Sequence, residues 1–135
     1  MRVLLIDDTP EIAELLTFAL RDHGHEVVAV GFDPAIGDLV AAHRPDALVI
    51  DCTSFDMTEM LFDAVRANAA YATLPIVVVS DTPEKADVSL RRREADHVLL
   101  IPKPFTGGQI ARALAQLVGQ STANSRSPVP NSRNP

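Results

Sequence analysis

The sequence predicts an α/β fold in which a doubly wound, five-stranded parallel sheet is flanked by five helices. Two observations lead to this class. Short apolar runs rich in β-branched residues alternate along the chain with longer segments whose apolar residues recur at helical spacing. The runs are apolar at every position rather than at every second one, which is typical of parallel strands that helices cover on both faces. Right-handed crossovers are expected between such strands.

The first strand and the first helix come before Gly24. The apolar run at residues 3–6 is the expected strand. Apolar residues then recur at intervals of three and four, as on one face of a helix: Ile12, Leu15, Leu16, Ala19 and Leu20. Thr9 and Pro10 are typical of a helix start, and Gly24 is typical of the position just after a helix end.

The middle of the chain repeats this alternation. Strands are expected at residues 27–30 and 47–50, and each is followed by a shorter amphipathic helix. The positions with helical spacing are Ile36, Leu39, Val40 and His43 in the second helix, and Leu61, Ala64, Val65 and Asn68 in the third.

The last two strands are expected at residues 76–79 and 98–101. Pro83 opens the helix between them, around residues 84–94, whose apolar stripe is thin. The fifth helix has the same spacing as the first: Ile110, Ala113, Leu114, Leu117 and Val118.

Residues 119–135 are polar and rich in proline, serine and asparagine. Such a segment buries too little apolar surface to offset the entropy lost on ordering. We therefore expect a folded domain over residues 1–118 and a disordered polar tail over residues 119–135. Because both charges of the tail are arginines, the domain is more acidic than the chain's net charge of −6 indicates.

Composition excludes several classes of protein. With 135 residues, 47% of them hydrophobic, the chain can bury a core without disulfides. The single cysteine, Cys52, and the charged amino-terminal segment predict a reducing, cytoplasmic location without a secretory signal. No uncharged apolar run approaches the ~20 residues of a membrane helix. The negative charge disfavours nucleic acid as the main partner.

Polar residues follow four of the five strands, at the sheet edge where open α/β folds bind ligands. Asp7 and Asp8 follow the first strand, Asp51 the third and Ser80 the fourth. Lys103, one of only two lysines, lies between two prolines after the fifth. An aspartate or a serine at any one of these positions, taken alone, is more often only a helix cap or a turn residue.

Together, these residues indicate a reactive site rather than a set of turns. Clustered carboxylates repel one another unless a cation or an ammonium group neutralises them. Mg²⁺ commonly takes one or two carboxylates together with phosphate oxygens, and a carboxylate can itself accept a phosphoryl group. A hydroxyl and an ammonium would position the phosphoryl oxygens. The set predicts Mg²⁺-dependent phosphoryl acceptance.

Four stretches, taken in order, resemble the receiver domain of two-component response regulators. They read VLLIDD at 3–8, LVID at 48–51, VVVS at 77–80 and KPF at 103–105. The resemblance covers residues 1–118 and implies the flavodoxin-like strand order 2-1-3-4-5.

The resemblance also implies a role for each residue at the strand ends. Asp51 would be the phosphoacceptor and would bind Mg²⁺ together with Asp7, Asp8 and the backbone carbonyl of Thr53. Ser80 would reorient toward the phosphoryl group. Lys103 would pair with it, and the Lys103–Pro104 peptide would be cis, an isomer that costs little before proline.

The resemblance further implies partners. A histidine kinase or phosphotransfer protein would donate the phosphoryl group. Phosphorylation would alter the face formed by the helix at 84–94, the strand at 98–101 and the fifth helix, and this face would bind a downstream protein target or a second copy in a homodimer. Because the polar tail is too short for an output domain, we expect a stand-alone, non-enzymatic receiver that signals by protein–protein contact.

Three features depart from the family pattern and leave alternatives open. Asp81 occupies a position where the family has a small residue, Leu100 one where an aromatic residue is common, and residues 52–59 lack the Met-Pro and Asp-Gly pairs. A receiver-like scaffold that binds partners without phosphorylation is therefore one alternative. An Asp-nucleophile phosphatase or phosphotransferase is disfavoured, because Thr53 stands where such an enzyme has an acidic residue.

Overall fold

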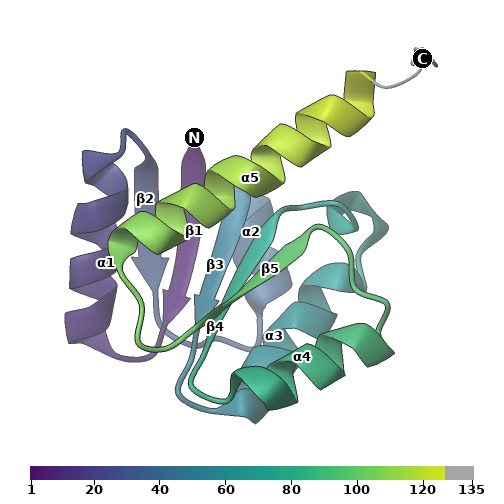
Figure 1. Ribbon diagram of the computed structural model, residues 1–135, viewed down its shortest axis with the longest axis horizontal. Coiled ribbons are helices and arrows are strands. Elements are labelled where there is room, and N and C mark those ends of the chain that lie inside the picture. The colour runs from purple at the N-terminus through teal and green to yellow at the C-terminus, as the bar shows by residue number, and fades with distance from the viewer. Residues whose placement is uncertain (127–135) are drawn as a thin grey trace.

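Five parallel strands form one sheet in the order β2-β1-β3-β4-β5 (Figure 1). The computed structural model describes the backbone of residues 1–126 and the side chains of residues 1–119. The strands are β1 (Arg2–Asp7), β2 (Glu26–Val30), β3 (Ala47–Asp51), β4 (Ile76–Ser80) and β5 (Val98–Pro102). The predicted fold class and strand order are confirmed.

Helices cover both faces of this sheet (Figure 1). They are α1 (Pro10–Asp22), α2 (Ile36–His43), α3 (Phe55–Arg66), α4 (Pro83–Arg92) and α5 (Gly107–Arg126), with a 3₁₀ helix, η1, at Ala69–Tyr71. Helices α1 and α5 pack on one face, where Val3 and Leu5 of β1 point. Helices α2 and α3 pack on the other, against Leu4 and Ile6. Burial on both faces explains why the strands are apolar at successive positions.

Several helix ends follow the local sequence signals, and the end of α3 does not. Thr9 precedes α1, and the Ser54 hydroxyl at the start of α3 accepts a hydrogen bond from the Met57 N–H. Gly24 has a positive φ of 88°, as expected of a residue after a helix. Asn68, predicted to lie in the third helix, comes after α3 and starts η1, where its side chain accepts the Ala70 N–H. A short polar side chain competes with helical hydrogen bonding in this way.

The fifth helix is longer than the sequence predicts. It continues to Arg126 through residues 119–126, which the sequence analysis assigned to a disordered tail. That prediction considered only apolar burial. Once a helix is formed, each added residue gains a backbone hydrogen bond, and proline first interrupts the chain at Pro128. Residues 127–135 lie outside the described residues.

None of the helices within residues 1–126 combines the length and the apolar character that crossing a bilayer requires.

Gly107 marks a close contact between the start of α5 and α1. A Cβ at this position would overlap the Cβ of Ala19, which is attached directly to the α1 backbone and cannot turn away. Gly107→Ala is therefore expected to lower the free energy of unfolding by about 1–3 kcal/mol, as overpacking does elsewhere. Urea unfolding measures this effect.

Gly37→Ala is the matched control for this change. Gly37 lies in α2, and apart from its chain neighbours and the nearby backbone of its own helix no atom lies within 4 Å of where its Cβ would be. Alanine there is expected to leave the stability unchanged or to raise it by up to about 1 kcal/mol, because alanine favours the helix. Equal effects of the two substitutions would contradict the close α1–α5 contact.

Candidate functional site

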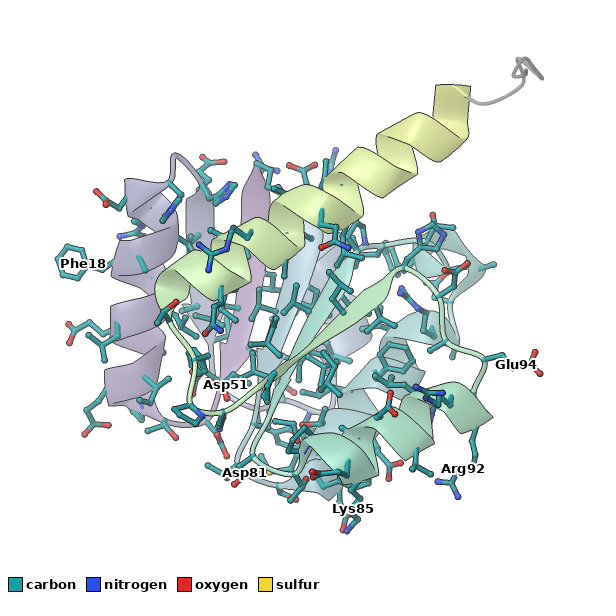
Figure 2. The ribbon with its side chains drawn as sticks, in the orientation of Figure 1. Phe18, Asp51, Asp81, Lys85, Arg92 and Glu94 are labelled. Atoms are coloured by element: carbon teal, nitrogen blue, oxygen red, sulfur yellow. The ribbon has the colours of Figure 1, made fainter. Side chains whose placement is uncertain are left out.

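The predicted site residues lie together at the carboxyl edge of the sheet. The strand register pairs Asp7 with Asp51 and Ser80 with Pro102. Lys103 follows β5, and its N–H donates to the Ser80 carbonyl at 2.8 Å. The Lys103–Pro104 peptide is cis, as the resemblance implied. Figure 2 shows Asp51 toward the same end of the sheet as Asp81, which follows β4.

The centre of the site is a pair of buried carboxylates. Asp51 is 1% exposed and Asp7 is 4% exposed. The Lys103 ammonium lies 2.8 Å from Asp51 Oδ1, an ion pair that reaches across two strands. Within the described residues, Asp51 Oδ2 and Asp7 Oδ2 are buried without any hydrogen-bond partner. Two buried negative groups thus share one ammonium, an arrangement that favours a further cation.

This environment changes the acidity of both Asp7 and Lys103. Burial raises the pKa of Asp7 to about 7, and repulsion from Asp51 and Asp8 acts in the same direction, against a hydrogen bond from the Thr9 N–H. Burial alone would lower the pKa of Lys103, but its contact with Asp51 outweighs burial and the net shift is upward. Lys103 therefore stays charged, whereas Asp7 holds a proton more readily than an exposed aspartate does.

Asp8 is bound to the loop after β3. Its carboxylate accepts the Thr53 N–H at 3.1 Å on Oδ1 and 3.3 Å on Oδ2, and the Thr53 hydroxyl donates to Oδ2 at 2.6 Å. In the part of the chain that the structure describes, no three His, Cys, Asp or Glu side chains are gathered to hold a metal ion. Asp8 is thus close in the fold to Asp7 and Asp51 without forming a ready ligand set with them.

The residues nevertheless fit a magnesium ion. The unpartnered oxygens of Asp7 and Asp51 are the hard donors that Mg²⁺ requires, and Mg²⁺ needs only one or two protein carboxylates because it keeps several waters. Asp8 would join them after leaving Thr53. The roles predicted for Asp7, Asp8, Asp51 and the Thr53 carbonyl as metal ligands stay predictions.

Ser80 lies at the end of β4 with its hydroxyl engaged by Thr82. The Thr82 N–H donates to Ser80 Oγ at 3.0 Å, and the two hydroxyl oxygens are 3.3 Å apart. Thr82 is not among the predicted site residues, although its position two residues after Ser80 parallels that of Thr53 after Asp51. Each threonine therefore uses both its N–H and its hydroxyl to hold a neighbouring site residue.

The unusual residues of the sequence lie around the site rather than in it. Asp81 is exposed, and its charge adds to the raised pKa of Lys103. Leu100 is in the middle of β5 beside Val78 and packs on the α2–α3 face. Cys52 is buried next to Asp51, and burial raises the pKa of its thiol to about 12. Cys52 is therefore an unreactive core residue.

Comparison with known proteins adds sequence similarity to this geometry. No protein-family model matches the sequence. The chain is 31% identical over 119 residues to the DNA-binding response regulator MtrA of Mycolicibacterium smegmatis, across 86% of this chain and 50% of MtrA. It is 32% identical over 111 residues to a protein-glutamate methylesterase/protein-glutamine glutaminase of Rhodopseudomonas palustris, across 77% of this chain and 29% of that protein. The chain thus spans half or less of the length of these relatives.

Solved structures share the fold. The signal receiver domain of a histidine kinase from Syntrophus aciditrophicus superposes with a TM-score of 0.74 at 20% identity, covering 88% of this chain and 90% of that one. The receiver domain of a sensor histidine kinase from Pseudomonas aeruginosa, solved with a magnesium ion coordinated in its active-site cleft, gives a TM-score of 0.68 at 22% identity, covering 87% and 97%. Sequence similarity and fold agree, and this chain belongs to the response-regulator receiver domains of two-component signalling systems.

Proposed function

We propose that Asp51 accepts a phosphoryl group from a histidine kinase or phosphotransfer protein in a Mg²⁺-dependent reaction in the cytoplasm. The observation that carries this proposal is the Asp51 carboxylate itself, which is 1% exposed, is ion-paired with Lys103 and is paired in the sheet with Asp7, whose Oδ2 has no hydrogen-bond partner. The anionic carboxylate of Asp51, the ammonium group of Lys103 and the expected cation site therefore lie close together. These are the parts that phosphoryl transfer uses.

Each residue has a definite part in the proposed reaction. An oxygen of Asp51 forms the new bond to phosphorus while the bond from phosphorus to the donor's histidine nitrogen breaks, and the released imidazole keeps the bonding electron pair. Asp7, Asp8 and the Thr53 carbonyl would hold Mg²⁺, which when bound neutralises the phosphoryl oxygens. The Lys103 ammonium would move from Asp51 to a phosphoryl oxygen.

Ser80 connects this reaction to the rest of the fold. Its hydroxyl would leave Thr82 and donate to the phosphoryl group, which draws the loop between β4 and α4 toward Asp51. We propose that the face of α4, β5 and α5 carries the output to a downstream protein target or to a second copy of the chain. Val88, 56% exposed on α4, supplies an apolar contact point there.

The donor would approach along α1. This helix begins beside Asp8 and exposes two large apolar side chains one turn apart, Leu15 at 65% and Phe18 at 74%. Figure 2 shows Phe18 pointing away from the body of the domain. Exposed apolar side chains on a helix next to the reacting group are typical of a docking surface.

The proposal is tested by treating the protein with acetyl phosphate and measuring its intact mass. With Mg²⁺ present we expect a gain of one phosphate that hydroxylamine removes, as an acyl phosphate requires. With EDTA in place of Mg²⁺ we expect no gain. Absence of a gain with Mg²⁺, with acetyl phosphate and with several donor kinases alike, would favour the non-phosphorylated scaffold.

The scaffold remains the second candidate because of two observations. Asp81 adds negative charge beside Lys103, which disfavours a bound phosphate, and Asp8 is already occupied by Thr53. A scaffold would bind its partners equally well with and without acetyl phosphate. Multiple turnover of a phosphoester substrate would instead support an enzyme.

Mg²⁺ affinity is expected to rise with pH. Because the pKa of Asp7 is raised to about 7, a proton must leave this carboxyl before a cation binds below that pH. Calorimetric titration at pH 6 and pH 8 should show tighter binding at pH 8, by about tenfold at most for each pH unit below the pKa. An affinity that does not change with pH would show that Asp7 does not take part.

The same raised pKa predicts how the stability of the metal-free protein depends on pH. The folded state retains the Asp7 proton up to about pH 7, whereas an unfolded aspartate loses it near pH 4. The contribution of Asp7 to stability is therefore fully present below pH 4 and is lost as the pH rises to 7.

A further inference from the structure

Thr53 donates hydrogen bonds to the Asp8 carboxylate and so joins the loop after β3 to the loop after β1. We propose that the Thr53 hydroxyl holds Asp8 in a position that does not ligate metal, so that Mg²⁺ must displace this hydroxyl in order to bind. Thr53 would then be a positioning residue whose side chain weakens and thereby sets the Mg²⁺ affinity. This inference rests on the proposed Mg²⁺ dependence of the site.

The geometry of the contact shows why it competes with a cation. The Thr53 hydroxyl lies 2.6 Å from Asp8 Oδ2, a short distance typical of a hydrogen bond to a charged acceptor. The Thr53 N–H points to the same carboxylate at 3.1 and 3.3 Å. Both Asp8 oxygens thus already accept hydrogen bonds, and Oδ2 accepts from both the hydroxyl and the N–H, which uses the lone pairs of Oδ2 that a cation would otherwise bind.

The neighbouring carboxylates provide a second and independent observation, because some of their buried oxygens have no hydrogen-bond partner. Asp7 Oδ2 and Asp51 Oδ2 are buried and unpartnered, in residues that are 4% and 1% exposed. Yet over the described residues these two and Asp8 do not form a set that could hold a metal ion. The site therefore has two buried oxygens that suit a cation and a third carboxylate that is bound to Thr53.

Exposure makes the exchange feasible. Thr53 is exposed and Asp8 is half-buried, so water can take over the bonds that either residue loses. The contact also joins residues 45 apart in the sequence, so its release would free the β3–α3 loop from the β1–α1 loop. The hydroxyl, and not the N–H, is the part that a substitution can remove.

The test compares Mg²⁺ binding by wild type, Thr53→Val and Thr53→Ser, measured by calorimetry and by the Mg²⁺-dependent rise in melting temperature. Valine keeps the size and the backbone groups but lacks the hydroxyl. From the usual net value of one hydrogen bond, we expect Thr53→Val to bind Mg²⁺ about threefold to tenfold more tightly. Thr53→Ser keeps the hydroxyl and should bind as the wild type does.

Thr73→Val is the matched control. Thr73 is an exposed threonine before β4, at the opposite edge of the sheet. The Thr73→Val variant is expected to bind Mg²⁺ with the same affinity as the wild type. In an Asp8→Asn background, which weakens the hydrogen bond and removes the charged ligand, the effect of Thr53→Val should largely disappear.

The outcomes separate this inference from the proposed function. Unchanged or weaker Mg²⁺ binding by Thr53→Val, while the wild type binds, overturns the inference and leaves the proposed function intact. Tighter binding by Thr53→Val in a protein that acetyl phosphate does not modify supports the inference while phosphoryl acceptance fails. Mg²⁺ binding by none of the variants overturns both.

Discussion

Asp51→Asn should abolish the gain of one phosphate that the wild-type protein shows with Mg²⁺ and acetyl phosphate. The substitution preserves the size of the side chain and removes the anionic oxygen that attacks phosphorus. An amide oxygen is a poor nucleophile, so the expected loss is complete in an intact-mass measurement. Asp51 is the carboxylate in direct contact with Lys103, which makes it the acceptor favoured by the geometry.

Asp56→Asn provides the control for the same chemical change. Asp56 lies in the first turn of α3, is exposed and is in the same stretch of chain as Asp51. We expect this variant to gain one phosphate as the wild type does. A full gain in Asp51→Asn would place the acceptor on another side chain and would contradict the proposed role of Asp51.

Arg66→Ala should lower the free energy of unfolding by about 2–4 kcal/mol, a large fraction of the stability of a small domain. The guanidinium donates to four backbone carbonyls: those of Tyr71, Leu74, Asp96 and His97, at 2.9, 2.8, 2.9 and 3.1 Å. It also lies 5.2 Å from the centre of the Phe62 ring. One side chain thus joins the end of α3 to the loops before β4 and β5.

The magnitude follows from what the substitution leaves behind. Hydrogen bonds to a charged donor are worth more than neutral ones, and four carbonyls lose the guanidinium at once. The carbonyls of Tyr71 and His97 keep a second donor, the N–H groups of Leu74 and Ile76. The half-exposed position of Arg66 lets water replace part of this loss, which keeps the expected effect below the sum of four separate bonds. Urea unfolding measures the difference.

Two variants distinguish the geometry of Arg66 from its charge. Arg66→Lys keeps the charge but lacks the planar fork that reaches several carbonyls, so it should lose most of the same stability. Arg92→Ala removes an exposed arginine of α4, which Figure 2 shows pointing outward, and should change stability by less than about 0.5 kcal/mol. A loss below 1 kcal/mol in Arg66→Ala would mean that these contacts contribute little.

The predicted strands match those of the structure to within one residue at each end. Runs such as residues 3–6 and 47–50 are predictable because both faces of the central sheet are buried, which requires apolar residues at successive positions of each strand. The ends of the helices were predicted less accurately than those of the strands. The α3–η1 break at Ala67–Asn68 and the extension of α5 depend on capping and on helix propagation, which apolar spacing does not record.

The candidate site was predictable as a set of residues but not as a set of contacts. Parallel strands place their carboxyl ends at one edge, so Asp7, Asp51 and Ser80 had to come together. The pairing of Asp8 with Thr53 was not foreseen. It depends on how two loops lie across from each other, and each loop by itself reads as an ordinary turn.

The sequence by itself determined the α/β class, the family resemblance and the identity of the residues at the strand ends. These follow from local patterns of burial and from the order of the strands. Only the tertiary structure decided that Lys103 reaches Asp51, that Thr53 occupies Asp8 and that Arg66 joins three segments. Local patterns cannot predict them, because the contacts of Lys103 with Asp51, of Thr53 with Asp8 and of Arg66 with the loop before β5 link residues 30 or more apart in the sequence, and side-chain orientation across such distances has no periodic signal.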